Sequence, residues 1–192
     1  MNRFLLILTL LVFVLASCSD EGHDHDAVVI SRTQEHEIDT VKKSIKAYAQ
    51  NKIGAARFTI QYHSPAVRDR VIWGGLVPYD RVWVTGAHDA TSIESDKDFI
   101  IGAKEIPAGK YAFFTIPGKE EWTIIINKNW DQHQADEYKQ DDDLVRLQIK
   151  PDTLGYKQER LRYDIDQLSQ KEGNLQMMWD KLKLVIPVRI PD

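Results

Sequence analysis

Hydrophobic and polar residues follow a strand-like pattern along most of the chain after Gly54. Phe58, Ile60 and Tyr62 fall on one face of an extended segment, and polar residues fall on the other. Gly102-Ala103 and similar short turn signals separate further segments of this kind. The pattern predicts strands over 99–101, 104–106, 110–116, 122–127, 144–150, 159–166, 175–180 and 182–190. We therefore expect an all-β fold, an antiparallel β-sandwich of about nine or ten strands.

Two segments depart from this alternation. In residues 33–54, Ile38, Val41, Ile45 and Tyr48 recur at spacings of three and four, which predicts a short N-terminal helix that ends at Gly54. Residues 131–143 are polar and predict an exposed loop or a short helix. Neither segment adds a second core, so residues 34–192 are expected to form a single domain.

The first 17 residues are typical of a secretory signal peptide. Arg3 precedes an apolar run that is too short to span a bilayer. Leu15-Ala16-Ser17-Cys18 resembles the lipobox of bacterial lipoproteins, in which the cysteine is acylated and becomes the new N-terminus. Cys18 is the single cysteine of the chain, so no disulfide accounts for it. The alternatives are an uncleaved anchor or an ordinary secretory signal.

Residues 18–33 are expected to form a lipidated, flexible acidic tether. Its segment 19–26, SDEGHDHD, resembles export signals that send lipoproteins to the outer face of the outer membrane. The expected localisation is therefore the cell envelope, with the protein held at the outer membrane by the lipid on Cys18 and possible exposure at the surface. The same segment carries His23 and His25, but a flexible tether offers no fixed geometry for a specific metal site.

Composition narrows the expected partners. The formal net charge is -4, and removal of Arg3 with the signal peptide makes it -4 - 1 = -5. A domain with this balance lacks the basic stripe that nucleic-acid binding requires, so nucleic acid is excluded as a partner. The 43% content of hydrophobic residues is ordinary for a globular protein.

Long ungapped motifs resemble a known bacterial family. The runs YHSPAVRDRVIWGGLVPYDRVWVTGAHDAT (62–91), IPAGKYAFFTIPGKEEWTIIINKNWDQH (106–133) and LQIKP (147–151) resemble the domain-of-unknown-function family numbered 2911. The resemblance covers roughly residues 42–190. It implies a secreted or lipid-anchored all-β domain without a settled activity, and it supplies no catalytic residues to transfer.

Known catalytic motifs are missing from the sequence. It contains no G-x-S-x-G elbow, no phosphate-binding loop, no dinucleotide fingerprint and no H-E-x-x-H. His63 and Ser64 are adjacent, so in a strand they point to opposite faces. An enzyme is therefore less expected than a binding protein, and no cofactor is expected.

A metal site is the remaining catalytic option. His63, His88 and His133 are the histidines of the β region, and Asp89, Asp131 and Asp136 are possible carboxylate partners. A metal-dependent envelope hydrolase that uses His88 with His63 or His133 is the alternative hypothesis. Because the spacing is not that of a local metal motif, surface or hydrogen-bonded turn histidines are the favoured interpretation, and we predict no metal.

The first hypothesis is a binding site for an unknown small molecule, glycan or protein. Aromatic and hydrogen-bonding side chains gather between a proline corner and a glycine turn, where loops often carry function. The candidate ligand-binding residues are Tyr79, Arg81, Trp83, Thr85, His88 and Asp89. Gly86 predicts a backbone position with unusual dihedral angles, although a plain turn demands the same residue. Trp122 alternates with isoleucines and is expected in the core.

Overall fold

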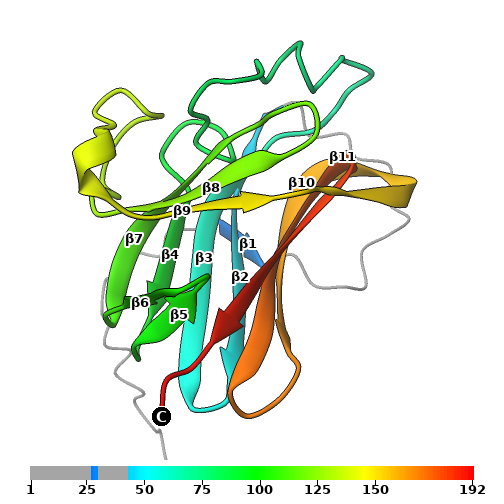
Figure 1. Cartoon of the computed structure of the whole chain (residues 1–192). Helices are drawn as coiled ribbons and strands as arrows, with labels where there is room; N and C mark the ends of the chain where they lie inside the picture. Colours follow the sequence, from blue (N-terminus) through cyan, green and yellow to red (C-terminus); the bar gives the residue numbers. More distant parts are fainter. Residues whose placement is uncertain (1–26, 30–42) are drawn as a thin grey trace, which may run out of the picture.

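The computed structural model describes residues 27–29 and 43–192, whose strands form two β-sheets packed face to face (Figure 1). A single 3-10 turn, η1 (Gln140–Asp142), is the helical element of these described residues. It lies in the segment predicted as a loop or short helix. The strands are β1 (Ala27–Val29), β2 (Ile45–Ile53), β3 (Ala56–Ser64), β4 (Ser92–Ser95), β5 (Phe99–Ile101), β6 (Lys104–Ile106), β7 (Gly109–Ile116), β8 (Trp122–Asn127), β9 (Asp143–Ile149), β10 (Asp152–Gln167) and β11 (Glu172–Arg189).

The strand order confirms the predicted class. The larger sheet runs β1-β2-β3-β4-β7-β8-β9 and the smaller one β10-β11-β5-β6. Neighbouring strands pair antiparallel, apart from β1 and β2, which pair in parallel. The chain is thus a β-sandwich, with β1 in the segment that the sequence assigned to the tether.

The predicted N-terminal helix is wrong over residues 45–53. These residues form β2, which pairs with β3 from Ile45↔Ser64 to Ile53↔Ala56. Gly54 does not end a helix; its φ of +60° opens the two-residue turn of a hairpin. Pairing to β3 satisfies the backbone of β2 and overrides the three-and-four spacing of its apolar residues. Residues 33–42 of the predicted helix lie outside the described residues.

Burial follows the predicted alternation. Phe58, Ile60 and Tyr62 of β3 are buried, and Trp122 is 1% exposed, which confirms its core position. The two C-terminal strands predicted over 175–180 and 182–190 are one strand, β11. Asp180 has a φ of +53° at a register irregularity with β10. The most deeply buried positions of β11 change there from odd numbers (Leu175, Met177, Trp179) to even numbers (Leu184, Ile186, Val188).

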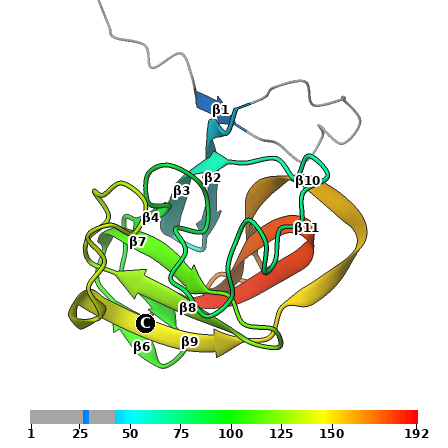
Figure 2. The same cartoon turned by 90° about the horizontal axis from the view of Figure 1, so that it is seen from above.

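Residues 65–91 connect β3 to β4 and contain no named strand. Seen from above, this connection loops over one end of the sandwich (Figure 2). Three isolated bridges tie it to other parts of the described chain: Ala66 to Arg160, Trp83 to Thr115 and Asp89 to His133. It contains most of the first family motif, so the densest polar and aromatic stretch of the sequence becomes the cover of one end of the fold.

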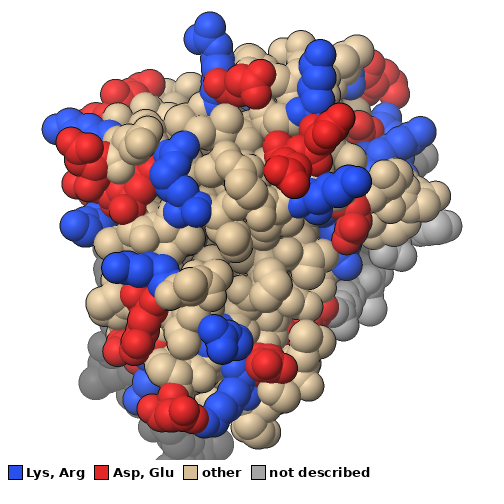
Figure 3. Space-filling view, viewed as in Figure 1, with Lys and Arg blue, Asp and Glu red and all other residues tan. Residues whose placement is uncertain are grey.

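The face shown in Figure 3 carries lysine and arginine intermixed with aspartate and glutamate around an uncharged centre. A groove of about 690 Å³ between residues of β5, β9 and β11 is lined mainly by aliphatic side chains, among them Leu147, Ile149 and Val185. No helix in the described part of the chain has the length and apolarity needed to cross a membrane.

Candidate functional site

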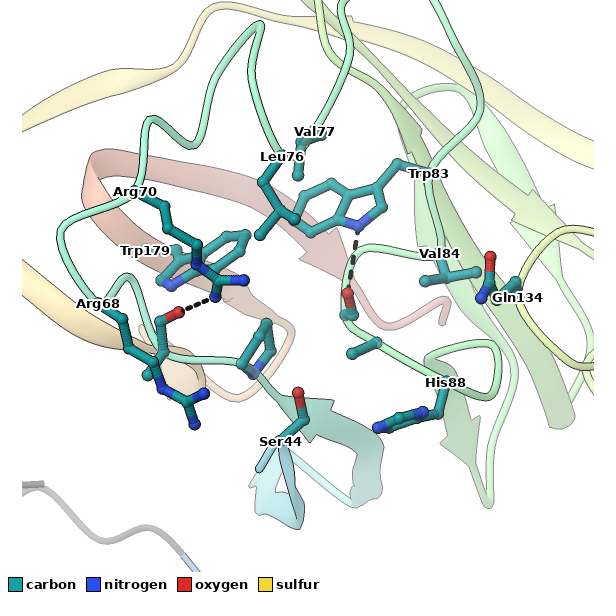
Figure 4. Close-up of a pocket in the computed structure, with 14 residues that line it drawn as sticks. Ser44, Arg68, Arg70, Leu76, Val77, Trp83, Val84, His88, Gln134 and Trp179 are labelled. Carbon is teal, nitrogen blue, oxygen red and sulfur yellow. Dashed lines mark hydrogen bonds between the residues drawn. The ribbon is translucent and has the colours of Figure 1, made fainter. Parts of the chain in front are cut away.

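A cavity of about 360 Å³ lies beneath the connection 65–91, at the end of the sandwich where β3 ends (Figure 4). We call it the loop-end cavity. Arg68 and Arg70 lie on one side of it, and His88 and Gln134 lie on the other. Ser44, just before β2, closes the lower edge in this view. The cavity therefore draws on four separate parts of the chain: residues 44, 65–88, 134 and 179.

Aromatic packing gives the cavity its apolar wall. The rings of Trp83 and Trp179 stack with centroids 5.8 Å apart and an interplanar angle of 20°. Trp73 packs edge-to-face on both of them and on Trp122, which lies in the core. Trp83 is half-buried, and its indole Nε1 donates a hydrogen bond to the carbonyl of Gly86 at 3.2 Å. The wall is thus continuous with the hydrophobic core and has little freedom to move.

The backbone around the cavity is strained. Arg68, Asp69, Asp80, Thr85 and His88 all have positive φ, between +49° and +60°. Each non-glycine residue in this region costs energy, and a β-branched residue such as Thr85 is an outlier there. Strain of this kind persists where surrounding contacts hold it, and such positions cluster at functional sites.

The contacts around Thr85 show what holds the strain. Thr85 is fully buried, and its carbonyl accepts hydrogen bonds from the Tyr163 hydroxyl at 2.7 Å and the Thr91 hydroxyl at 3.1 Å. Its own hydroxyl lies 3.0 Å from Thr115 Oγ1 and donates to the Trp83 carbonyl at 3.1 Å. These four contacts clamp the start of the turn that carries His88 into the cavity wall.

Gly86 does not have the unusual dihedral angles that the sequence suggested, because its φ is not positive. A Cβ atom at this position would lie 2.7 Å from Thr91 Oγ1 and 3.3 Å from the carbonyl oxygen of His63. The reason for glycine is therefore close packing, and the strained backbone falls instead on its neighbours Thr85 and His88.

Arg70 is fixed by the main chain. Its Nη2 donates to the carbonyl of Ala66 at 2.6 Å, and its Nε donates to the carbonyl of Val67 at 3.1 Å. Among the described residues, Arg70 forms no ion pair with a carboxylate. A guanidinium carries five N–H donors, so further donors remain beyond the two that hold it in place.

Two of the three candidate metal ligands lie together. The rings of His63 and His88 pack edge-to-face with centroids 5.2 Å apart. The ring of His133 instead contacts Asp136, with Nδ1 3.1 Å from Oδ2, although its backbone pairs with Asp89. Within the described residues, no group of three or more histidine, cysteine, aspartate or glutamate side chains is placed to hold a metal ion. The metal-dependent hydrolase hypothesis finds no support here.

Burial lowers the pKa of the His63 imidazole below its ordinary value. The carboxylate of Asp89 opposes this shift, while His88 and Lys46 lower the pKa further. His63 is therefore biased toward its neutral form. Within the described residues, neither His63 nor His88 forms a side-chain hydrogen bond to a hydroxyl or carboxylate.

The six candidate ligand-binding residues have different surroundings. Trp83 and His88 line the loop-end cavity. Tyr79 packs its ring over Gly74, where a Cβ atom would lie 2.7 Å from the ring. Thr85 is buried in the clamp described above, and Arg81 and Asp89 are exposed and do not line the cavity.

Five polar or aromatic residues of the cavity were not among those candidates: Ser44, Arg68, Arg70, Gln134 and Trp179. Arg68 and Arg70 belong to the same aromatic and polar stretch, so its composition could have indicated them. Gln134 is brought in because the backbone N–H of Gln134 donates to the carbonyl of His88 at 2.7 Å. Trp179 lies far along the sequence in β11, and no local pattern connects it with residues 65–88.

Fold and site together define a β-sandwich domain with a loop-built cavity at one end of its two sheets. The chain belongs to the family described as "Protein of unknown function (DUF2911)", whose model matches residues 44–188. This confirms the resemblance found in the sequence motifs. No curated protein and no solved structure matches the chain.

Proposed function

We propose that this protein is a lipid-anchored protein of the bacterial cell envelope that binds a small ligand in the loop-end cavity without catalysing a reaction. The observation that carries the binding proposal is the strained connection 65–91. This connection contains no named strand, and five of its non-glycine residues have φ angles in the left-handed region. Its residues form most of the cavity wall. Strain held in place by buried hydrogen bonds is typical of a preorganised site.

The size and lining of the cavity favour a small molecule over a protein or a long glycan. About 360 Å³ lies near the lower end of the range of ligand pockets. Aliphatic and aromatic walls combine with a few polar groups, as in sites that enclose a ligand and orient it. The histidine pair is not connected to a nucleophile, so the arrangement supports binding more than a reaction.

The anchor part of the proposal is supported by the sequence. The lipobox-like segment ending at Cys18 lies outside the described residues, and acylation of this cysteine would tie the chain to a membrane. Ser44 lines the cavity and β2 starts at Ile45, so the N-terminal end of β2 lies at the end of the sandwich that carries the cavity.

The test is equilibrium binding to the purified full-length protein, followed by tryptophan fluorescence. The panel contains monosaccharides, nucleosides, amino acids and small aliphatic and aromatic acids. Because Trp83 and Trp179 line the cavity, a bound ligand is expected to change the emission. Ala87→Phe places a large side chain at a lining position and is expected to abolish binding.

The matched control is Ala103→Phe, which makes the same change at an exposed position in the β5–β6 turn. It is expected to leave binding unchanged. The proposal is wrong if no member of the panel binds, or if binding survives Ala87→Phe in protein with an unchanged melting temperature.

A further inference from the structure

The loop-end cavity is cationic in an acidic protein. The chain has 29 acidic residues against 25 lysines and arginines. None of the 14 described residues that line the cavity is an aspartate or glutamate, whereas Arg68, Arg70 and His88 all line it (Figure 4). Because carboxylates are in the majority over the whole chain, their absence from this lining marks the cavity as a place for negative charge.

Two carboxylates close to Arg68 in the chain or in space, those of Asp69 and Glu159, have partners other than Arg70. Glu159 Oε1 accepts the backbone N–H of Arg68 at 2.8 Å. Lys157 Nζ lies 3.3 Å from Asp69 Oδ1 and 3.6 Å from Glu159 Oε2. The carboxylates of Asp69 and Glu159 thus pair with Lys157, which does not line the cavity. They leave the Arg70 guanidinium without a carboxylate partner in the described structure.

Arg70 is also preorganised to receive an anion. The carbonyls of Ala66 and Val67 hold two of its N–H donors, so the orientation of its plane is set before a ligand arrives. A fixed guanidinium matches the two oxygens of a carboxylate or phosphate, and less side-chain entropy is lost on binding than with a free arginine. The carbonyl contacts orient the charge and do not neutralise it.

The opposite part of the lining is apolar. Leu76, Val77 and Val84 supply aliphatic surface, and Trp83 supplies part of an aromatic one. An inorganic ion would leave this surface in contact with water. A ligand that satisfies both parts of the lining carries an anionic group and an apolar body, such as a ring or a short hydrocarbon chain.

We infer that the ligand of the loop-end cavity is a small amphipathic organic anion, with its carboxylate or phosphate on Arg70 and its apolar body against Leu76 and Trp83. This inference rests on the proposed function, since it names the chemical class of ligand for the same cavity. Arg70 is the residue that gives preference for charge, and the aliphatic and tryptophan wall gives preference for an apolar body.

Matched pairs of probes test the inference on the full-length protein. Phenylacetate and phenylacetamide have nearly the same shape and differ in charge; phenyl phosphate and inorganic phosphate differ in the apolar body. Titration calorimetry is expected to show phenylacetate binding at least about tenfold more tightly than phenylacetamide, as one charge-assisted contact implies. Phenyl phosphate is expected to bind, and inorganic phosphate is expected to bind much more weakly.

Arg70→Met is expected to reduce the preference for phenylacetate over phenylacetamide to about equal affinity, since one charge-assisted contact is lost. Arg57→Met removes an exposed arginine of β3 that does not line the cavity, and is expected to keep the preference. Because Arg70 also holds the loop, Arg70→Lys is the second variant. It keeps the charge without the fixed fork and is expected to retain part of the preference for phenylacetate.

The outcomes separate the two proposals. If phenylacetate and phenylacetamide bind equally and Ala87→Phe abolishes both, the cavity binds ligands but the anion inference is wrong. If Arg70→Met still binds phenylacetate more tightly than phenylacetamide, the inference is also wrong. Tight binding of inorganic phosphate alone contradicts the apolar part. If no probe and no member of the earlier panel binds, the proposed function itself fails.

Discussion

The Thr85 carbonyl offers a quantitative test of how the cavity wall is held. It is buried and accepts hydrogen bonds from two hydroxyl groups, of Tyr163 and of Thr91. Tyr163→Phe and Thr91→Val each remove one donor and keep the shape of the side chain. Either change alone leaves the carbonyl with one partner, so each is expected to lower the free energy of unfolding by about 1 kcal/mol.

The double variant is expected to cost more than the sum of the single ones. With both donors gone, the carbonyl oxygen is buried without a partner, which adds about 1–3 kcal/mol as the desolvation penalty of an unsatisfied group. The total loss is therefore about 3–5 kcal/mol. The coupling is expected because the two donors share one acceptor at a backbone position that is already strained by its φ of +52°.

Urea denaturation of the wild type, both single variants and the double variant gives the four free energies of this cycle. The control cycle combines Tyr163→Phe with Thr123→Val. Thr123 accepts a hydrogen bond from Gln148 at an exposed site of β8, so its effect is expected to add to that of Tyr163→Phe. Additivity within about 0.5 kcal/mol in the Thr91 cycle as well would refute the shared-acceptor reasoning.

Three further predictions concern separate features. His88→Gly and Asp80→Gly relieve left-handed φ angles of +59° and +60°, so both are expected to be neutral or to stabilise by up to about 1 kcal/mol. Only His88→Gly is expected to weaken ligand binding, and equal weakening by Asp80→Gly would contradict the cavity assignment. The pKa of His63 is lowered in the fold, so the unfolded chain takes up a proton first as the pH falls, and His63 destabilises the protein below about pH 6.5. His63→Gln is therefore expected to reduce the fall in melting temperature between about pH 7.5 and pH 5. An unchanged fall in His63→Gln would show that the lowered pKa of His63 does not contribute to the pH dependence of stability. Finally, Cys18→Ala is expected to move the protein from the membrane fraction to the soluble fraction, and retention in the membrane would show that the lipobox interpretation is wrong.

The Gly-Ala dipeptides show which hairpin turns the local sequence could predict. Gly102-Ala103 predicted a two-residue hairpin, and the structure has one between Ile101 and Lys104, with a φ of +61° at the glycine. The same dipeptide at Gly54-Ala55 makes the same kind of hairpin between Ile53 and Ala56. At Gly54, the helical spacing of the preceding apolar residues predicted the end of a helix instead. The Gly-Ala turn signal was present there, and the pairing of β2 with β3 decided in favour of the hairpin turn over the helix end.

The candidate site shows the opposite case. The sequence indicated the correct stretch, because Trp83 and His88 line the cavity. It could not tell which polar residues of that stretch face inward, since residues 65–91 have no period to follow. Arg70 and Arg81 are both exposed, but of the two only Arg70 lines the cavity, where the carbonyls of Ala66 and Val67 hold its guanidinium.

The sequence by itself determined the class of fold, the family and most of the core, because alternation is a local property of a strand and puts Phe58, Ile60 and Tyr62 on one face whatever lies opposite. Only the tertiary structure decided the loop-end cavity. Trp179 stacks on Trp83 because β11 packs behind the connection 65–91, and the bulge at Asp180 sets which residues of β11 face inward. Contacts between segments so far apart depend on how the two sheets pack, and no short-range pattern contains that information.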